Sequence, residues 1–191
     1  MARPSKKSDI IEAAAYLFST KGYHATTVRD IAHRAGVLSG SLYAHISNKE
    51  DLWREIVRQA AQSFTEALAP IINGPGPASE KLDRAVHAHV RVIATSLDRA
   101  SIYLETTAAF SDEGRDEVQR LHHAYEDLWG RLLEQGVQEG EFVIEDKHLA
   151  RLWVLSSVNS LYRWYRPDGR LSADEIAAHF SRWLRRALKS R

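Results

Sequence analysis

Small polar and basic side chains gather between residues 26 and 49, in the run TTVRDIAHRAGVLSGSLYAHISNK. Hydroxyl groups, an imidazole and long cationic side chains can hydrogen-bond phosphate oxygens and base edges. The small residues Gly40 and Ser41 let a helix press closely against such a partner. The chemistry expected here is binding of DNA, although an ordinary helical hairpin with exposed polar residues explains the pattern alone equally well. The candidate contacts are Thr27, Arg29, Ser39, Gly40, Ser41, Tyr43, His45 and Lys49.

Catalytic and metal-binding arrangements are absent from the sequence. His87 and His89 are two residues apart and would point to different sides of a helix, and the adjacent His122 and His123 have the same defect. The chain has no cysteine, so neither a disulfide nor a thiolate metal site can form. It also has no G-x-S-x-G and no G-x-x-x-x-G-K motif. We expect no enzyme, no metal and no cofactor.

Composition and charge are those of a soluble globular protein. The chain has 191 residues, with 44% hydrophobic and 27% charged residues and a net charge of +1. No apolar run approaches the roughly 18 residues of a membrane span, and no apolar segment follows the basic start MARPSKKSD. We therefore expect a cytoplasmic protein without membrane contact. Residues 1–50 carry an excess of basic over acidic side chains, which suits a polyanion, although a solvated mixed-charge surface explains it too.

The elements that must position these residues are all expected to be helices, about nine in number. Capping boxes start two of them, at Thr27 with Asp30 and at Ser172 with Glu175. Three short helices would form a helix-turn-helix domain over residues 1–50, and a long fourth helix would follow the N-cap Asn48. A larger helical domain would cover residues 51–191. The expected helices span about 5–21, 27–36, 39–45, 49–69, 78–97, 102–110, 112–139 and 146–165, with a loop at 70–77. A last helix would begin at the Ser172 capping box, with an apolar face from Ile176 to Ala187.

The run from residue 26 to residue 53 resembles the DNA-binding signature of the tetracycline-repressor (TetR) family. The resemblance lies in T-x-R-x-I-A, A-G-V, L-Y-x-H and K-E-x-L. It implies double-stranded operator DNA as a partner, with Arg29, Lys49 and the polar residues 39–45 on the DNA surface. Ala44 and Ile46 stand where the family often has aromatic residues, so smaller packing is expected there.

The same resemblance implies a C-terminal domain that dimerises and encloses a small-molecule effector. We expect a homodimer through the last two helices, whose apolar faces end in aromatic residues. Effector pockets are mostly apolar with a few polar groups. Polar and aromatic residues scattered among the apolar stripes are therefore candidates for the pocket: Phe64, His89, Tyr103, Phe110, His122, Trp129, Asn159 and Arg163.

The segment NSLYRWYRPDGRLSADEIAAHF is similar to the C-terminal region of TetR repressors of fatty-acid and steroid-ring breakdown. Several of those respond to acyl-CoA thioesters, so the resemblance implies a repressor that an acyl-CoA releases from a palindromic operator. One alternative is a TetR regulator of cationic or aromatic drugs, for which Glu105, Glu126 and Asp127 supply acids. Another is a small-molecule or lipid carrier that has kept the fold without operator binding.

Overall fold

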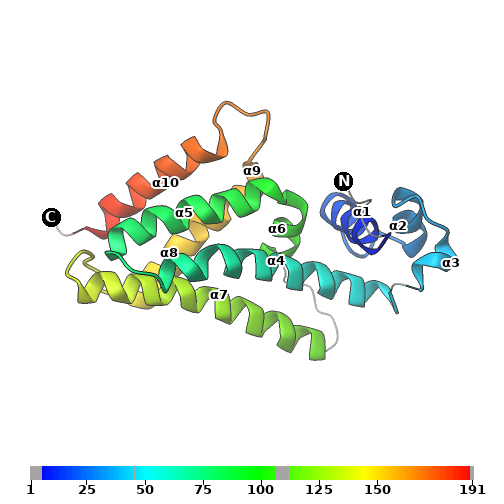
Figure 1. The fold of residues 1–191 in the computed structure, drawn as a ribbon, viewed down its shortest axis with the longest axis horizontal. Coiled ribbons are helices and arrows are strands. Elements are labelled where there is room, and N and C mark those ends of the chain that lie inside the picture. Colours follow the sequence, from blue (N-terminus) through cyan, green and yellow to red (C-terminus); the bar gives the residue numbers. More distant parts are fainter. Residues whose placement is uncertain (1–5, 45, 106–111, 190–191) are drawn as a thin grey trace. The chain divides into compact units, whose positions relative to one another are not determined.

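The computed structural model describes residues 6–44, 46–105 and 112–189. Every regular element in these ranges is a helix, which confirms the expected all-helical fold (Figure 1). No helix formed by these residues is long and apolar enough to cross a membrane. The helices are α1 (Lys6–Lys21), α2 (Val28–Arg34), α3 (Ser39–Leu42), α4 (Lys49–Ile72), α5 (Ala78–Thr95), α6 (Leu97–Leu104), α7 (Asp112–Gln138), α8 (Lys147–Asn159), α9 (Leu161–Trp164) and α10 (Ala173–Leu188).

The chain divides into two compact units. Unit 1 comprises residues 1–60 with 98–119, and unit 2 comprises residues 61–97 with 120–191. The helices α4 and α7 each contribute residues to both units. The units also place α6 and the start of α7 with the N-terminal helices. The expected division into functional domains at residue 50 stays a prediction.

Unit 1 is built around α1, whose buried face carries Ile10, Ala14 and Phe18. Ile31 of α2 and Leu42 of α3 are also fully buried, as expected for the inner face of a helix-turn-helix. Polar contacts add α6 and α7 to this unit. Ser19 Oγ donates a hydrogen bond to Asp98 Oδ1 at 2.7 Å, and Arg58 of α4 forms an ion pair with Glu117 of α7. These contacts fix the start of α6 and of α7 beside the N-terminal helices.

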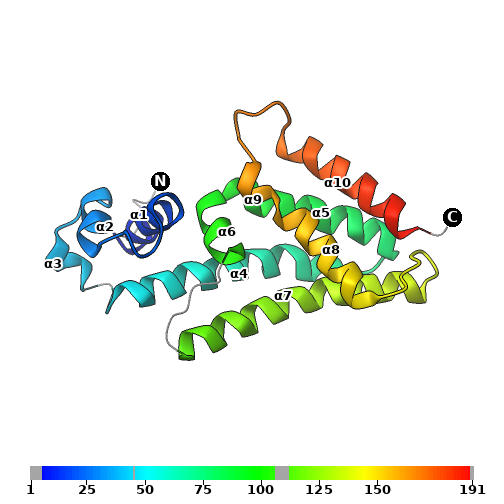
Figure 2. The ribbon, with the colours of Figure 1, turned by 180° about the vertical axis from the view of Figure 1, so that it is seen from behind.

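Unit 2 is a layered packing of α10 and α8 on α5 (Figure 2). Its core contains Val86 and Val90 of α5, Leu132 of α7, Val154 of α8 and Leu184 of α10, all 2% exposed or less. Helix α10 begins at the expected capping box, in which Ser172 Oγ accepts from the backbone N–H of Glu175. Apolar residues recur at helical spacing along one face of α5 and one face of α10. The packing of these two faces explains why this pair has the most extensive contact in unit 2.

Helix α4 continues to Ile72, so the expectation of a loop from residue 70 was wrong. Pro70 lies in the last turn of α4 and is exposed. Proline has no backbone N–H, so the carbonyl of Glu66, four residues earlier, loses its helical hydrogen bond. Because Pro70 is exposed, water can bond that carbonyl instead. Ile72 is 5% exposed, and its burial favours continuing the helix past the proline.

Three other expected boundaries also differ. The helix expected at 146–165 is split at Ser160. The Ser160 hydroxyl donates to the Ser157 carbonyl, and the Ser160 carbonyl accepts a hydrogen bond from the Arg163 N–H. The second bond is the tighter i→i+3 type, which interrupts the α-helical pattern. Helix α6 begins at Leu97 rather than at 102, because Asp98 favours the first turn of a helix. Helix α3 ends at Leu42 rather than at 45.

Candidate functional site

The first part of the site is the start of α2. Thr27 Oγ1 accepts a hydrogen bond from the backbone N–H of Asp30 at 3.1 Å, and Asp30 Oδ2 accepts from the Thr27 N–H at 3.0 Å. The bond from the Thr27 N–H, together with the Thr27 hydroxyl, holds the pKa of the Asp30 carboxyl below its ordinary value. The predicted capping box is confirmed, and it fixes the end of α2 from which Arg29 projects into solvent.

The turn between α2 and α3 exposes a small polar surface. Gly36 ends α2 with a φ of +66°, a conformation that side chains with a Cβ rarely adopt. A Cβ added to Gly40 on α3 would meet no atom within 4 Å, so this face of α3 is open. The Tyr43 ring that follows is 58% exposed. A helix end with such a face can enter a DNA groove without displacing other parts of the protein.

Most of the predicted DNA contacts are exposed. These are Thr27, Arg29, Ser39, Gly40 and Tyr43, which belong to α2, α3 and the residues beside them. Their contact with DNA stays a prediction. Ser41 lies in α3 but its side chain is outside the description, and His45 lies outside the described residues.

Lys49 has a different environment from these residues. Its Nζ donates hydrogen bonds to the backbone carbonyls of Tyr23 and Thr26, both at 2.9 Å, and lies 4.2 Å from the centre of the Tyr23 ring. The lysine therefore fastens the start of α4 to the connection between α1 and α2. Its DNA contact stays a prediction.

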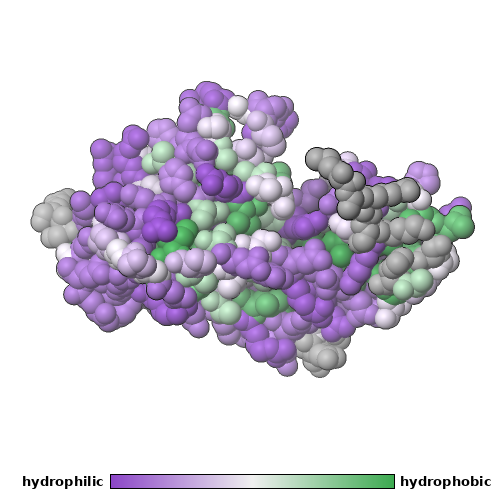
Figure 3. Space-filling view, viewed as in Figure 1, coloured by the Kyte–Doolittle hydropathy of each residue, from purple (hydrophilic) through white to green (hydrophobic). Residues whose placement is uncertain are grey.

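Leu38 is a surface residue that the sequence reading missed. It is 80% exposed, although it stands four residues before the buried Leu42. Helical periodicity places both on the inner face, but Leu38 is the extended N-cap residue of α3, so its side chain leaves that stripe. Figure 3 shows apolar surface over α2 and α3. An exposed leucine there suits contact with a thymine methyl group or a sugar ring.

The second part of the site is a buried polar cluster in unit 2, formed by α4, α5, α7 and α8. His89 is fully buried, and its Nδ1 lies 2.7 Å from the Tyr125 hydroxyl. That hydroxyl lies 3.4 Å from Asn159 Oδ1. The His89 ring stacks at 5.0 Å on Phe64 and meets the edge of Trp129 at 5.9 Å. The structure thus brings together Phe64, His89, Trp129 and Asn159 of the predicted pocket, around a Tyr125 that the sequence reading missed.

This cluster is electrically neutral and holds an unsatisfied N–H group. Burial lowers the pKa of His89 to about 3, against a smaller upward effect of a hydrogen bond with the Val158 backbone. Within the described part of the chain, Trp129 Nε1 is buried without a hydrogen-bond partner. Buried N–H groups usually have a partner, so this one can donate to an acceptor of a ligand or of a water molecule.

The other predicted pocket residues lie on α6, α7 and α9 or outside the described range. Tyr103 is buried in α6 and belongs to unit 1. His122 is half-buried on α7. Arg163 is exposed on α9, where its Nε donates to the Tyr162 hydroxyl at 2.9 Å. Phe110 lies outside the described residues.

The third part of the site is an apolar surface on α8, α9 and α10. On α8, Leu149 is 60% exposed and Trp153 is 45% exposed. The Trp183 ring of α10 is 55% exposed and packs against Phe180, which in turn meets Trp164 of α9. Exposed aromatic residues concentrated on neighbouring helices are typical of a surface that a partner covers.

Comparisons with known proteins identify this arrangement. Residues 10–56 match the model described as "Bacterial regulatory proteins, tetR family", and residues 75–188 match "Tetracyclin repressor-like, C-terminal domain". The chain belongs to the TetR family. The helix-turn-helix and the larger helical domain that follows it are therefore the two domains of a TetR-family regulator.

Individual TetR-family relatives match almost the whole chain. The transcriptional repressor KstR2 of Rhodococcus jostii (strain RHA1) is 31% identical over 180 residues, which cover 93% of this chain and 88% of the relative. The structure of the ketosteroid transcriptional regulator KstR2 of Mycobacterium tuberculosis covers 100% of this chain and 98% of that one, with a TM-score of 0.89 and 27% identity. AibR in complex with isovaleryl coenzyme A and operator DNA covers 94% of this chain and 98% of that one, with a TM-score of 0.85 and 26% identity.

Proposed function

We propose that this TetR-family protein is a homodimeric transcriptional repressor that binds a palindromic operator and leaves it when an acyl-CoA thioester binds unit 2. The observation that carries the proposal is the similarity to AibR, whose structure contains both isovaleryl coenzyme A and operator DNA. The similarity to the KstR2 repressors supports the repressor role. We infer no enzymatic activity, because the described residues and the relatives point to DNA binding alone.

Operator binding is assigned to the exposed surface of α2 and α3. Tyr43, Arg29 and Ser39 supply donors for phosphates and base edges, and the open face at Gly40 lets the backbone of α3 approach the groove. Two copies of this surface are needed to read two half-sites in successive major grooves. We assign the second copy to a dimer that covers the exposed Leu149, Trp153 and Trp183, in line with the homodimer expected through the last two long helices.

The effector is assigned to the buried cluster around His89. Phe64, Tyr125 and Trp129 offer ring surfaces to an acyl group, and Trp129 Nε1 offers a hydrogen bond to an oxygen on it. The neutral His89 keeps the cluster free of charge. This is an environment for an uncharged, partly polar group such as a thioester or a keto-substituted acyl chain.

Binding of a cationic drug would need acidic side chains, and two of the three candidate acids already have an arginine as neighbour. Arg151 lies 3.8 Å from Glu126 Oε2 and 3.9 Å from Asp127 Oδ1, so both carboxylates have a cationic neighbour. The third acid, Glu105, is exposed. A cationic drug in the His89 cluster would meet no carboxylate among these residues, so the structure favours the neutral acyl group.

Release from the operator would be an allosteric effect. An effector that binds one conformation of unit 2 better than another shifts the population of the whole dimer. Helices α4 and α7 contribute to both the effector-binding unit and the unit that carries the DNA surface. A displacement of either helix by the bound acyl group would change the separation of the two reading surfaces.

An electrophoretic shift assay with the intergenic DNA upstream of the gene tests this function. We expect a shifted protein–DNA complex that dissociates when an acyl-CoA is added and that persists when free CoA or cationic dyes are added.

Tyr43→Ala should lower the affinity for this DNA at least tenfold while leaving the thermal unfolding temperature unchanged, because the ring is exposed and its loss leaves no cavity. Tyr16→Ala, which removes another part-exposed tyrosine of unit 1, is the control. Absence of any shift at low salt would refute operator binding, and dissociation by dyes alone would refute the acyl-CoA effector.

A further inference from the structure

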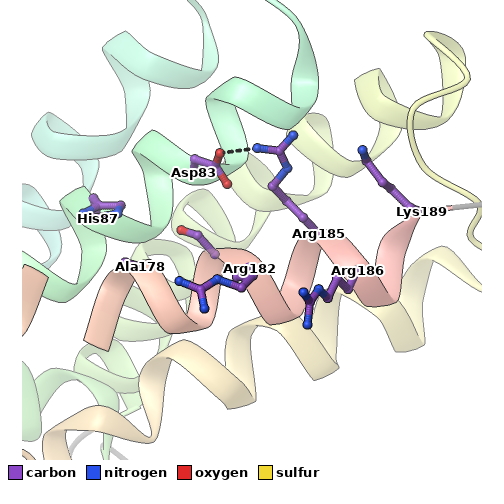
Figure 4. Close-up of a pocket in the computed structure, with 8 residues that line it drawn as sticks. Asp83, His87, Ala178, Arg182, Arg185, Arg186 and Lys189 are labelled. Atoms are coloured by element: carbon purple, nitrogen blue, oxygen red, sulfur yellow. Dashed lines mark hydrogen bonds and ion pairs between the residues drawn. The ribbon is translucent and has the colours of Figure 1, made fainter. Parts of the chain in front are cut away.

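A basic groove lies between α5 and α10 in unit 2 (Figure 4). Its volume is about 420 Å³, within the range of small-molecule sites. Four cations line it, Arg182, Arg185, Arg186 and Lys189, whereas Asp83 is the one acid among the described residues that line it. The three arginines come from the last two turns of α10 and Lys189 is its C-cap, and cations at this end also complement the helix dipole. The groove is therefore strongly positive in a protein whose net charge is only +1.

Three of the four cations are available to a ligand. Arg185 Nη1 is engaged by Asp83 Oδ2 at 2.7 Å. Arg182, Arg186 and Lys189 form no ion pair with any residue that the structure describes, and all three are exposed. Figure 4 shows Arg185 turned toward Asp83, while the side chains of Arg182 and Lys189 extend from α10 on either side of it. The one acid of the groove is thus neutralised, and the remaining charges are uncompensated.

Buried polar atoms distinguish this groove from an ordinary basic helix end. Ser181 is 5% exposed and lines the groove, and its Oγ has no hydrogen-bond partner among the described residues. The second oxygen of Asp83, Oδ1, is likewise buried without a partner in that part of the chain. Solvation of a helix end explains exposed cations, but it does not explain a buried hydroxyl donor and a buried carboxylate acceptor beside them.

We propose that this groove binds a nucleotide, either free or as the nucleotide part of coenzyme A. Phosphate oxygens would accept from Arg182, Lys189 and the Ser181 hydroxyl, and the guanidinium forks suit phosphate oxygens. A ribose hydroxyl or a base amino group would donate to Asp83 Oδ1, which a simple inorganic anion cannot do. The groove is separate from the apolar surface, because α10 presents Ile176, Phe180 and Trp183 to a different hollow on its other flank.

Calorimetric titration of the full-length protein without DNA tests this site, with ADP, coenzyme A and pyrophosphate as ligands. We expect ADP or coenzyme A to bind more tightly than pyrophosphate. The double variant Arg182→Ala/Lys189→Ala should weaken that binding at least tenfold, and Ser181→Ala should weaken it about threefold. The double variant Arg120→Ala/Arg131→Ala is the matched control, because it removes two exposed α7 charges outside the groove.

The titration results test ligand binding in the groove independently of operator binding. Binding of coenzyme A but not of ADP would support the site and assign it to the CoA thioester, and binding of ADP alone would support a free nucleotide. Failure of all three ligands to bind at millimolar concentration would overturn the proposal, as would equal affinity in both double variants. Pyrophosphate binding as tightly as ADP would overturn the nucleotide assignment. The groove variants should shift operator DNA as the wild type does, so a failed shift assay and a failed titration remain distinguishable.

Discussion

At the scale of single residues, the buried imidazole of His89 has the most distinctive chemistry. It lies in a ring of aromatic side chains, and its Nδ1 contacts the Tyr125 hydroxyl at 2.7 Å. Burial lowers its pKa to about 3, so the ring stays neutral throughout the physiological range. A neutral histidine can accept or donate one hydrogen bond without bringing a charge into an acyl pocket.

The low pKa of His89 predicts a pH dependence of stability. The unfolded chain binds a proton at His89 below about pH 6.5 and the folded chain does not, so stability falls as pH drops from 6.5 toward 3. From pH 7 to pH 5 the loss attributable to this residue is about 2 kcal/mol. Denaturant unfolding of the wild type and of His89→Gln at several pH values measures it. The wild type should lose about that much more than the variant over this interval, and parallel profiles would contradict the prediction.

At the scale of elements, the DNA-reading surface depends on how α4 is joined to the helices before it. Asn48 caps α4 by accepting from the Asp51 N–H at 2.8 Å, and Lys49 reaches back to the Tyr23 and Thr26 carbonyls. Thr26 is itself 1% exposed, and its hydroxyl donates to the Gly22 carbonyl at 2.8 Å. The lysine thus acts on DNA binding by orienting α2 relative to α4, whether or not it touches a phosphate.

Replacing Lys49 by methionine separates these roles. The variant keeps the aliphatic stem but loses two charge-assisted hydrogen bonds to backbone carbonyls, so unfolding should become easier by about 2 kcal/mol. Lys21→Met is the matched control, because Lys21 makes only an exposed ion pair with Asp30 at 3.4 Å, of the kind that contributes about 1 kcal/mol or less. Thermal unfolding of both variants measures whether Lys49 stabilises the fold more than Lys21 does. If Lys49→Met is as stable as Lys21→Met, the lysine has no structural role and a direct phosphate contact is the better interpretation.

At the scale of the whole molecule, function requires a second copy of the chain. Most of the exposed large apolar residues of unit 2 lie on α8, α9 and α10, which contact one another or share α5 as a neighbour. A helix pair that leaves leucine and tryptophan in water is stabilised when the same pair of another protomer covers it. The second protomer also supplies the second half-site reader.

Disruption of this surface should make the protein monomeric. Leu149→Glu/Trp153→Glu places two charges where the proposed interface is apolar, so light scattering should report the mass of one chain and operator affinity should fall at least a hundredfold. Val143→Glu is the control, because Val143 is similarly exposed, at 58%, but lies outside α8 and α10. A dimeric double variant would place the interface elsewhere.

The amino-acid sequence by itself determined the all-helical fold, the two capping boxes and the position of the helix-turn-helix. These features depend on interactions within three to five residues, such as Thr27 with Asp30, or on a short motif such as that around Tyr43. Local propensity did not predict the continuation of α4 through Pro70, because the burial of Ile72 outweighs the proline.

Only the tertiary structure decided which distant side chains meet. Tyr125 is 36 residues from His89, and Arg185 is 102 residues from Asp83, so no periodicity in the sequence joins either pair. The same holds for Lys49, whose sequence position suggests a phosphate contact but whose ammonium is fixed by carbonyls 23 and 26 residues away. Helical spacing reveals which face of a helix is buried. Packing between helices decides which polar groups on those faces find partners and which remain for a ligand.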